Sequence, residues 1–168
     1  MRKKDNIILI GMPASGKSTI GVVLAKKLGF DFVDTDLSIQ KQEKKLLRDI
    51  IDERGINGFL KIENQVNKEV DVQSSVISPG GSVIYCKEAM EHYKGIGRII
   101  YLQVSYDEIE KRLADAKNRG VILREGQSLK ELYNERVPLF EAYANITIKQ
   151  DGLTIGESIE AVIDALQT

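Results

Sequence analysis

The sequence has little of several features that mark particular classes of protein. It contains one cysteine, Cys86, so no disulfide can form within the chain. It has three prolines, which are scattered, and no segment rich in Pro, Gly or Ser divides the chain. Its apolar runs are short, and NIILI near the N-terminus is too short for a signal peptide or a membrane span. These absences predict a single domain over residues 1–168, located in the cytoplasm.

An excess of charge of one sign is also missing. The 24 Lys and Arg residues nearly balance the 25 Asp and Glu residues, so the formal net charge is -1 at pH 7. We therefore expect neither nucleic acid nor a membrane surface as a partner, and any anion must bind at a local site. The one histidine, His92, lies in the polar stretch EAMEHYKG and is expected to be solvated rather than to act as a base. The sequence contains no cluster of Cys and His residues that would indicate a bound metal.

Alternating patterns of apolar residues predict the fold class. Between the short apolar runs, apolar residues recur at helical spacing, as in STIGVVLAKKLG and in SYDEIEKRLADA, where Ser105 is a candidate N-cap. Strands that alternate with helices predict an α/β fold with a parallel sheet covered on both faces. The runs rich in β-branched residues predict strands at residues 6–10, 30–33, 74–78, 98–104 and 145–149.

Two stretches depart from this alternation. Residues 37–72 are charged and mostly helical in pattern, with a break at ERGING, and they lie between the second and third predicted strands. We interpret them as an inserted helical region that binds substrate. Residues 116–128, AKNRGVILREGQS, are rich in Gly and Arg. They are interpreted as a lid, and a plain solvated loop is the alternative.

The stretch GMPASGKSTIG predicts a nucleotide site. It follows a predicted strand, precedes a predicted helix, and fits the P-loop pattern Gly-x-x-x-x-Gly-Lys-Ser. The glycines allow backbone N–H groups to face phosphate, Lys17 neutralises its charge, and Ser18 can hold Mg²⁺. A Gly-rich turn with no ligand would not require Lys followed by Ser at this spacing. The candidate nucleotide-binding residues are Gly11, Ala14, Ser15, Gly16, Lys17, Ser18 and Thr19.

Two carboxylates, Asp34 and Asp36, follow the second predicted strand in GFDFVDTD. On an extended segment both would point to one side, at the edge where open α/β sheets bind ligands. One can then serve Mg²⁺, while the other receives a hydroxyl proton or hydrogen-bonds an acceptor. Alternatively, Asp36 only caps the following helix. The small size and the absence of an Asn-Lys-x-Asp motif favour a small-molecule or nucleotide kinase over a GTPase.

At these residues the chain resembles the shikimate kinase family, and the resemblance covers nearly the whole length. It implies a three-layer α/β/α fold of the nucleoside monophosphate kinase type, with a five-stranded parallel sheet ordered 2-3-1-4-5. It also implies an enzyme of aromatic amino acid biosynthesis that moves the γ-phosphate of ATP to a hydroxyl of shikimate or a related small acid. The matching stretches, in order, are GMPASGKSTIG, DTD, GFLKIE, SPGGSVI, NRGVIL and ERVPLF.

On the donor side, the resemblance assigns ATP and Mg²⁺ to the P-loop. Lys17 and Ser18 match the residues that hold the phosphates and the metal, and Asp34 matches the carboxylate on the metal side. Arg119 matches the lid arginine that reaches the phosphates, so Lys17 and Arg119 are expected to be catalytic. Arg112 falls where the family places a residue near the adenine, although a mid-helix Arg is usually just solvated.

On the acceptor side, the resemblance places shikimate against two loops and one helix. Asp36 matches the carboxylate that binds the acceptor hydroxyls and can act as base, with Asp34 beside it. Gly80 and Gly81 match the glycine loop that substrate approaches. Arg136 matches the arginine that pairs with the acceptor carboxylate, and a bidentate Arg suits that role. We expect a monomer, because a small lid-closing kinase can work as one.

Two residues depart from the family pattern. The inserted helix of the family reads Phe-Arg-x-x-Glu, and its Arg is a second clamp on the acid; here FLKIE puts Leu60 in that place. Lys61 is adjacent, but neighbouring helical positions are about 100° apart. Ser82 replaces the third loop glycine. Losing one of two arginines weakens charge-assisted hydrogen bonding by about 2–4 kcal/mol, roughly 30- to 1000-fold in affinity.

These departures leave three interpretations open. Lys61, Arg48 or Arg54 supplies the missing charge, and shikimate is still the acceptor. Otherwise the chain phosphorylates a different small acceptor, such as a sugar acid or a nucleotide precursor. A third interpretation is a regulatory module that binds nucleotide without catalysis, although it would have no need of Asp36 and Arg136.

Overall fold

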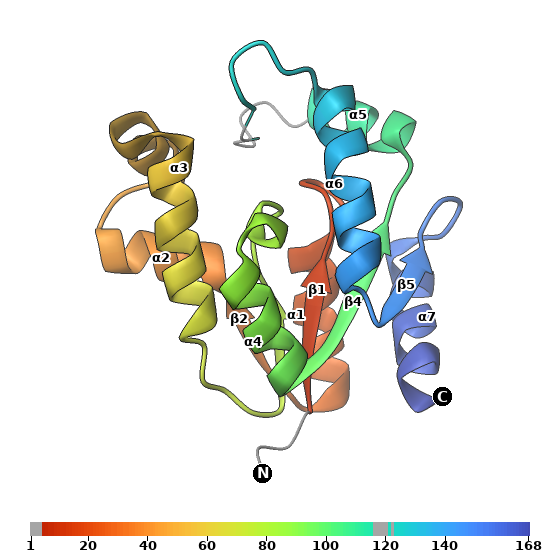
Figure 1. Ribbon diagram of the computed structural model, residues 1–168. Coiled ribbons are helices and arrows are strands. Elements are labelled where there is room, and N and C mark those ends of the chain that lie inside the picture. The colour runs from red at the N-terminus through yellow and green to blue at the C-terminus, as the bar shows by residue number, and fades with distance from the viewer. Residues whose placement is uncertain (1–4, 116–120, 122) are drawn as a thin grey trace.

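The sheet of the predicted α/β fold is present. The computed structural model describes residues 5–115, 121 and 123–168, and its five strands form one parallel sheet ordered β2-β3-β1-β4-β5 (Figure 1). This order and the α/β class confirm the expectation. Each predicted strand agrees with an observed one to within one residue at either end. The strands are β1 (Asn6–Ile10), β2 (Asp31–Asp34), β3 (Ser75–Ser78), β4 (Gly97–Gln103) and β5 (Ile146–Lys149).

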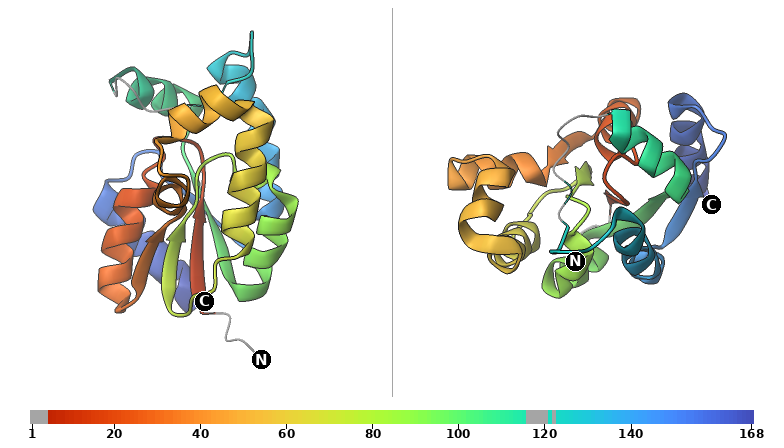
Figure 2. Two further views of the ribbon diagram at one scale, coloured as in Figure 1. Left: turned by 90° about the vertical axis from the view of Figure 1, so that its left-hand side faces the viewer. Right: turned by 90° about the horizontal axis from the view of Figure 1, so that it is seen from above.

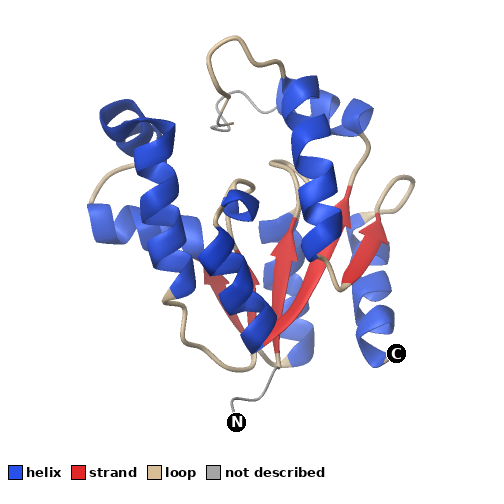
Figure 3. Ribbon diagram, in the orientation of Figure 1, coloured by secondary structure: helices blue, strands red, loops and turns tan. Residues whose placement is uncertain are grey.

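Helices connect the strands as right-handed parallel topology requires (Figure 3). Two of them separate β2 from β3, where the sequence predicts an inserted helical region. None of the described helices is both long and apolar enough to cross a membrane. The helices are α1 (Lys17–Leu28), α2 (Thr35–Glu43), α3 (Leu47–Lys68), the 3-10 helix η1 (Val83–Tyr85), α4 (Lys87–Ile96), α5 (Tyr106–Asp115), α6 (Leu129–Tyr143) and α7 (Ile155–Gln167).

The sheet is the middle of three layers, as Figure 2 shows. Successive side chains of β1 point to opposite faces, and all five of its residues are buried. Ile8 packs in one cluster with Tyr93 of α4 and Phe140 of α6. Leu9 packs in the other with Leu24 of α1 and with residues of α7. Both faces are therefore covered, which explains why the central strands are continuous apolar runs.

A third, smaller core joins α2 to α3 beside the sheet. It contains Ile39 of α2 and Ile50 and Phe59 of α3. Helix α3 is kinked at Gly55, whose φ of 72° and ψ of 173° lie outside the range of ordinary L residues. This kink falls within ERGING, where the sequence pattern predicts a break. The part of α3 after the kink runs beside α4 (Figure 1).

The predicted lid, residues 116–128, is only partly described. Residues 116–120 and 122 lie outside the described residues, and Arg119 is among them. In the described part, a turn is closed by a hydrogen bond from the Gln127 N–H to the Arg124 carbonyl, 2.9 Å. Ser128 then caps α6 by accepting from the Glu131 N–H at 3.1 Å. The lid segment therefore leads directly into the helix that carries Arg136.

Candidate active site

The phosphate loop joins β1 to α1 at the carboxyl edge of the sheet. Steric constraints favour glycine at two of its positions. A Cβ on Gly11 would lie 2.8 Å from Ser15 Oγ and 2.9 Å from the Leu102 carbonyl oxygen. Gly16 is the N-cap of α1 with φ 94°, in the left-handed region that glycine adopts most easily. This compact loop presents backbone N–H groups and the positive end of the α1 dipole to the pocket.

Lys17, the first residue of α1, lies against the loop. Its Nζ donates to the carbonyl oxygens of Gly11 and Met12, both at 2.8 Å. Ser18 and Thr19 follow it and are exposed. These three residues line the same large pocket as Ala14. Of the predicted loop residues, Ala14, Gly16, Lys17, Ser18 and Thr19 line this pocket, whereas Gly11 and Ser15 do not.

Two side chains from distant elements hold the outer part of the loop. The Gln150 Nε2 donates to the Ser15 carbonyl at 2.8 Å, and Gln150 is 5% exposed. Arg112 Nη1 donates to the Ala14 carbonyl at 3.0 Å, while its Nε pairs with Glu108 at 3.0 Å. The sequence reasoning missed Gln150, and its one signal was a polar residue directly after a predicted strand. Arg112 lies at the phosphate loop, and its predicted position near adenine stays a prediction.

Asp34 and Asp36 are arranged differently from the prediction, although both line the large pocket. Asp34 ends β2 and caps α2, since its Oδ1 accepts from the N–H groups of Asp36 at 3.0 Å and Leu37 at 3.2 Å. The expectation of one extended segment is wrong, because α2 begins at Thr35. The alternative in which Asp36 caps the helix is also wrong. An aspartate before a helix strongly favours the N-cap, and Asp34 satisfies that preference first.

The half-buried Asp36 and the buried Glu63 form an acidic pair beside Gly80. A Cβ on Gly80 would lie 2.8 Å from Asp36 Oδ1 and 2.9 Å from Glu63 Oε2, so glycine leaves room between the two carboxylates. Neither of these oxygens has a hydrogen-bond partner within the described part of the chain. Burial and the nearby Asp34 raise the pKa of Asp36 to about 6, against the opposing effect of Lys17. Both oxygens are therefore available to a ligand.

Glu63 projects from α3 and is 1% exposed. Its Oε1 accepts a hydrogen bond from Ser82 Oγ at 2.6 Å. Burial raises its pKa to about 7, while the Ser82 hydrogen bond and the Arg136 charge act in the opposite direction. Ser82, at the third position of the loop, thus holds the Glu63 carboxyl. The sequence pattern GFLKIE contained Glu63, but it was not predicted as a site residue.

Arg136, on α6, closes one side of the large pocket. It is 2% exposed, its Cζ lies 5.4 Å from the centroid of the Tyr85 ring, and its Nε has no hydrogen-bond partner among the residues described. A Cβ on Gly81 would lie 3.0 Å from Arg136 Nη1, so Arg136 borders the glycine loop.

The three cations proposed to replace the missing arginine are placed differently from one another. Lys61 is exposed and lines neither described pocket near Arg136. Arg54 pairs with Glu43 at 3.4 Å. Arg48 is exposed at the rim of the large pocket, with its Nε 3.7 Å from Asp49. Leu60 itself is half-buried and lines a small recess together with Arg136.

The structure also defines the contacts of three further side chains, His92, Cys86 and Tyr85. His92 is half-buried, with its Nε2 2.6 Å from the Val70 carbonyl oxygen, so the expectation of a solvated side chain is wrong. Cys86 is 4% exposed, and its Sγ donates to the Leu60 carbonyl at 3.6 Å and to Glu63 at 3.9 Å. Tyr85 lies against Arg136 and lines a small recess together with it.

The P-loop, the acidic pair and Arg136 line one pocket of about 850 Å³ at the carboxyl edge of the sheet. A phosphate loop facing such a pocket, on a parallel sheet ordered 2-3-1-4-5, defines a P-loop small-molecule kinase. Comparison with known proteins gives the family. The sequence model described as shikimate kinase matches residues 13–167. The chain therefore belongs to the shikimate kinase family and is an ATP-dependent kinase.

Individual relatives agree over nearly full length. The chain is 37% identical to a shikimate kinase of Thermodesulfovibrio yellowstonii over 161 residues, which cover 94% of this chain and 92% of that one. It is 34% identical to one of Actinobacillus succinogenes, with 99% and 97% covered. The solved shikimate kinase of Acinetobacter baumannii in complex with shikimate has a TM-score of 0.89 at 27% identity, with 99% and 94% covered. Likeness to a gluconokinase of Sinorhizobium meliloti, at 15% identity and a TM-score of 0.53, shows the fold alone.

Proposed function

We propose that the chain transfers the γ-phosphoryl group of ATP to a hydroxyl group of shikimate. The observation that carries this proposal is one pocket lined by Lys17 of the phosphate loop, by the acidic pair of Asp36 and Glu63, and by Arg136. A phosphate donor, a polyhydroxylated ring and a carboxylate each have a matching group there. The structural likeness to a shikimate kinase in complex with shikimate supports the same acceptor.

The donor half is proposed to act by positioning and charge. Lys17 and the loop amides hold the phosphates, while Arg112 and Arg119 are proposed to contact ATP from α5 and the lid. Catalysis of this kind needs little covalent chemistry from the protein. The remaining loop residues, Ala14, Ser15 and Thr19 with the two glycines Gly11 and Gly16, are proposed to line the nucleotide.

The residues present fit Mg²⁺. Ser18 is exposed at the start of α1, and Asp34 lines the same pocket, so a hydroxyl and a carboxylate oxygen face one space. Mg²⁺ prefers hard oxygen donors and keeps several waters, which suits two protein ligands plus phosphate. The cap uses Oδ1 of Asp34 and does not require its second oxygen. Mg²⁺ bound there would offset the negative charge of the phosphates during transfer.

On the acceptor half, Asp36 is proposed to orient the attacking hydroxyl and receive its proton. With a pKa of about 6, this carboxylate is mostly ionised at neutral pH, and its Oδ1 is buried at the pocket. Arg136 is proposed to bind the acceptor carboxylate, with Gly80 and Gly81 allowing close approach to the backbone. We further infer that the enzyme acts as a monomer in the cytoplasm, on a small molecule rather than on nucleic acid or a membrane.

A coupled assay of ADP release tests the proposal. The purified chain is given ATP, Mg²⁺ and a panel of acceptors comprising shikimate, sugar acids, sugars and nucleosides. ADP release that depends on shikimate supports the proposal. Turnover of another acceptor in preference to shikimate assigns a different substrate, and ATP binding without turnover of any acceptor favours a regulatory module.

One substitution tests the donor half. Lys17→Ala removes the ammonium that faces the phosphates and is expected to abolish phosphoryl transfer, which the same assay measures. Thermal unfolding of the variant controls for misfolding, because Lys17 also hydrogen-bonds the loop. A folded Lys17→Ala variant with unchanged activity would show that the phosphate-loop assignment is wrong.

A further inference from the structure

A small recess opens beside the acceptor half of the pocket and contains a second arginine. Leu60, Arg124 and Arg136 all line it. Three of its lining residues, Ile56, Ser82 and Arg136, also line the large pocket, so the two spaces are adjacent. Arg124 therefore lies at the same end of the site as the buried guanidinium of Arg136.

Hydrogen bonds connect the backbone of Arg124 with residues at this end of the site. The Arg124 N–H donates to Gln127 Oε1 at 3.3 Å, and Gln127 Nε2 donates to Glu135 Oε2 at 3.0 Å. The Tyr85 hydroxyl donates to the same Glu135 oxygen at 3.0 Å, and the Tyr85 ring lies against Arg136. A continuous set of contacts thus links the turn of Arg124 to the residues that hold Arg136.

The charges of the recess favour an anion. Its ionisable charges are Arg124, Arg136 and Glu135. Hydrogen bonds from Gln127 and then Tyr85 lower the pKa of Glu135, and the charges of the two arginines add to this effect. With Glu135 ionised, two positive charges and one negative charge remain at this end. The large pocket, in contrast, has more acidic than basic side chains in its lining: Asp34, Asp36, Asp52 and Glu63 against Lys17, Arg48 and Arg136.

We propose that Arg124 is a second carboxylate-binding residue, which acts with Arg136 on the acid group of the acceptor. This inference rests on the proposed function, since it assumes that the acceptor is a carboxylic acid. The half-buried Leu60 supplies an apolar part of the recess wall in place of a cation. Arg124 reaches the recess from the lid segment, so the acid group would be bound between α6 and the base of the lid.

The substitution Arg124→Gln tests this role while keeping a polar side chain. The KM for shikimate is expected to rise about tenfold, which is the effect of losing one charge-assisted hydrogen bond at an exposed site. The KM for ATP is expected to change less than twofold. With the methyl ester of shikimate, which has no negative charge, the variant is expected to match the wild type. Preference for the acid over the ester, as the ratio of kcat/KM values, therefore falls about tenfold.

Lys130→Gln is the matched control, because Lys130 is an exposed cation in the first turn of α6, close to Arg124 in the sequence, and lines neither pocket. It is expected to keep wild-type values. Leu60→Arg, added to Arg124→Gln, places a cation in the same recess and is expected to restore most of the lost affinity for shikimate. Failure of this restoration in a folded double variant would count against a shared recess and overturn the inference.

Other outcomes separate this inference from the proposed function. If the wild type phosphorylates shikimate and Arg124→Gln leaves its KM unchanged, the inference alone is overturned. If acid and ester lose affinity equally, Arg124 has a structural role and the inference is also overturned. A wild-type chain that turns over only acceptors without a carboxylate overturns both.

Discussion

Two acidic residues that line the large pocket, Asp36 and Glu63, lower the free energy of unfolding at neutral pH. Glu63 is buried and the nearby Asp36 is half-buried, and burial raises the pKa of both, to about 7 and about 6. A buried carboxylate is held there at a cost in folding free energy at neutral pH, because its charged form is poorly solvated. Such a cost is common where a site is arranged for a ligand rather than for the fold itself.

The substitution Glu63→Gln should stabilise the protein, and the gain should depend on pH. The folded protein holds the Glu63 proton up to about pH 7, whereas the group titrates at its ordinary 4.5 when unfolded. Between these values the folded state binds more protons, so wild-type stability falls as pH rises through this window. Glutamine does not titrate and keeps an acceptor for Ser82. The variant should gain about 1–3 kcal/mol at pH 8 and almost nothing at pH 4.5.

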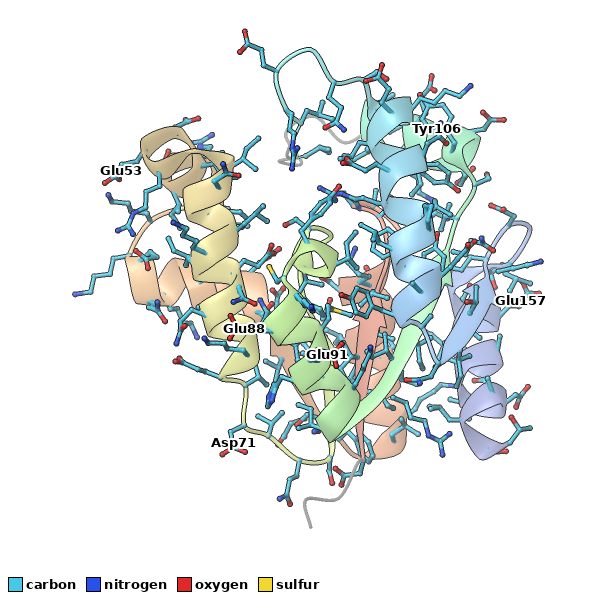
Figure 4. All side chains as sticks on the ribbon, in the orientation of Figure 1. Glu53, Asp71, Glu88, Glu91, Tyr106 and Glu157 are labelled. Carbon is cyan, nitrogen blue, oxygen red and sulfur yellow. The ribbon has the colours of Figure 1, made fainter. Side chains whose placement is uncertain are left out.

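Urea unfolding of both proteins at pH 4.5, 6 and 8 measures this gain. Glu157→Gln is the control, because Glu157 lies on the exposed outer surface at α7 (Figure 4) and should give no gain that increases with pH. A Glu63→Gln variant that is equally or less stable than the wild type at pH 8 would contradict the buried, poorly solvated carboxyl described above.

At the scale of elements, the sequence predicts the features that depend on residues close together in the chain. Strand positions follow from apolar runs, and the phosphate loop follows from glycine spacing and the lysine that ends it. The prediction that DTD is extended chain was wrong, because Asp34 acts as an N-cap and α2 therefore begins at Thr35. Contacts such as Ser82 to Glu63, 19 residues apart, and Gln150 to Ser15, 135 residues apart, depend on packing and leave no local pattern.

The kink in α3 is an element-scale feature with a direct test. Gly55 has φ 72° and ψ 173°, and a Cβ there would meet no atom within 4 Å, so alanine is opposed by backbone strain alone. Gly55→Ala should cost about 1–3 kcal/mol. It should also raise the KM for shikimate, because the kink sets the direction from which Phe59 and Glu63 enter the site.

Gly95→Ala is the matched control for Gly55→Ala. Gly95 lies in α4, has no positive φ, and offers the same open space to a Cβ. Alanine should therefore leave stability unchanged or raise it by about 0.5–1 kcal/mol, since it suits a helix better than glycine. Equal thermal unfolding of the two variants would show that the α3 kink is not strained for alanine.

At the scale of the whole molecule, the site is built from segments far apart in the sequence. The phosphate loop, α3, the loop after β3 and α6 all line the large pocket. A ligand in this pocket contacts several segments at once and binds only the folded state. Shikimate at about 100 times its dissociation constant should therefore add about 2.7 kcal/mol to stability, a rise of roughly 5–10 °C in Tm.

Differential scanning fluorimetry with increasing shikimate measures this rise. Arg136→Met is the informative variant, because it keeps a long apolar side chain and removes the buried guanidinium. Its Tm without ligand should be lower or similar, and its increase with shikimate should largely disappear. An undiminished increase in a folded Arg136→Met protein would mean that Arg136 does not bind the acceptor.

The surroundings of Cys86 give the protein a built-in chemical reporter. Its sulfur is buried against the Leu60 carbonyl and the Glu63 carboxyl, and burial raises the pKa of the thiol. Thiol reagents attack the thiolate, so alkylation requires η1 and α3 to separate. As the chain has one cysteine, any label marks this position alone. The rate of labelling thus reports how often the acceptor side opens, without an engineered probe.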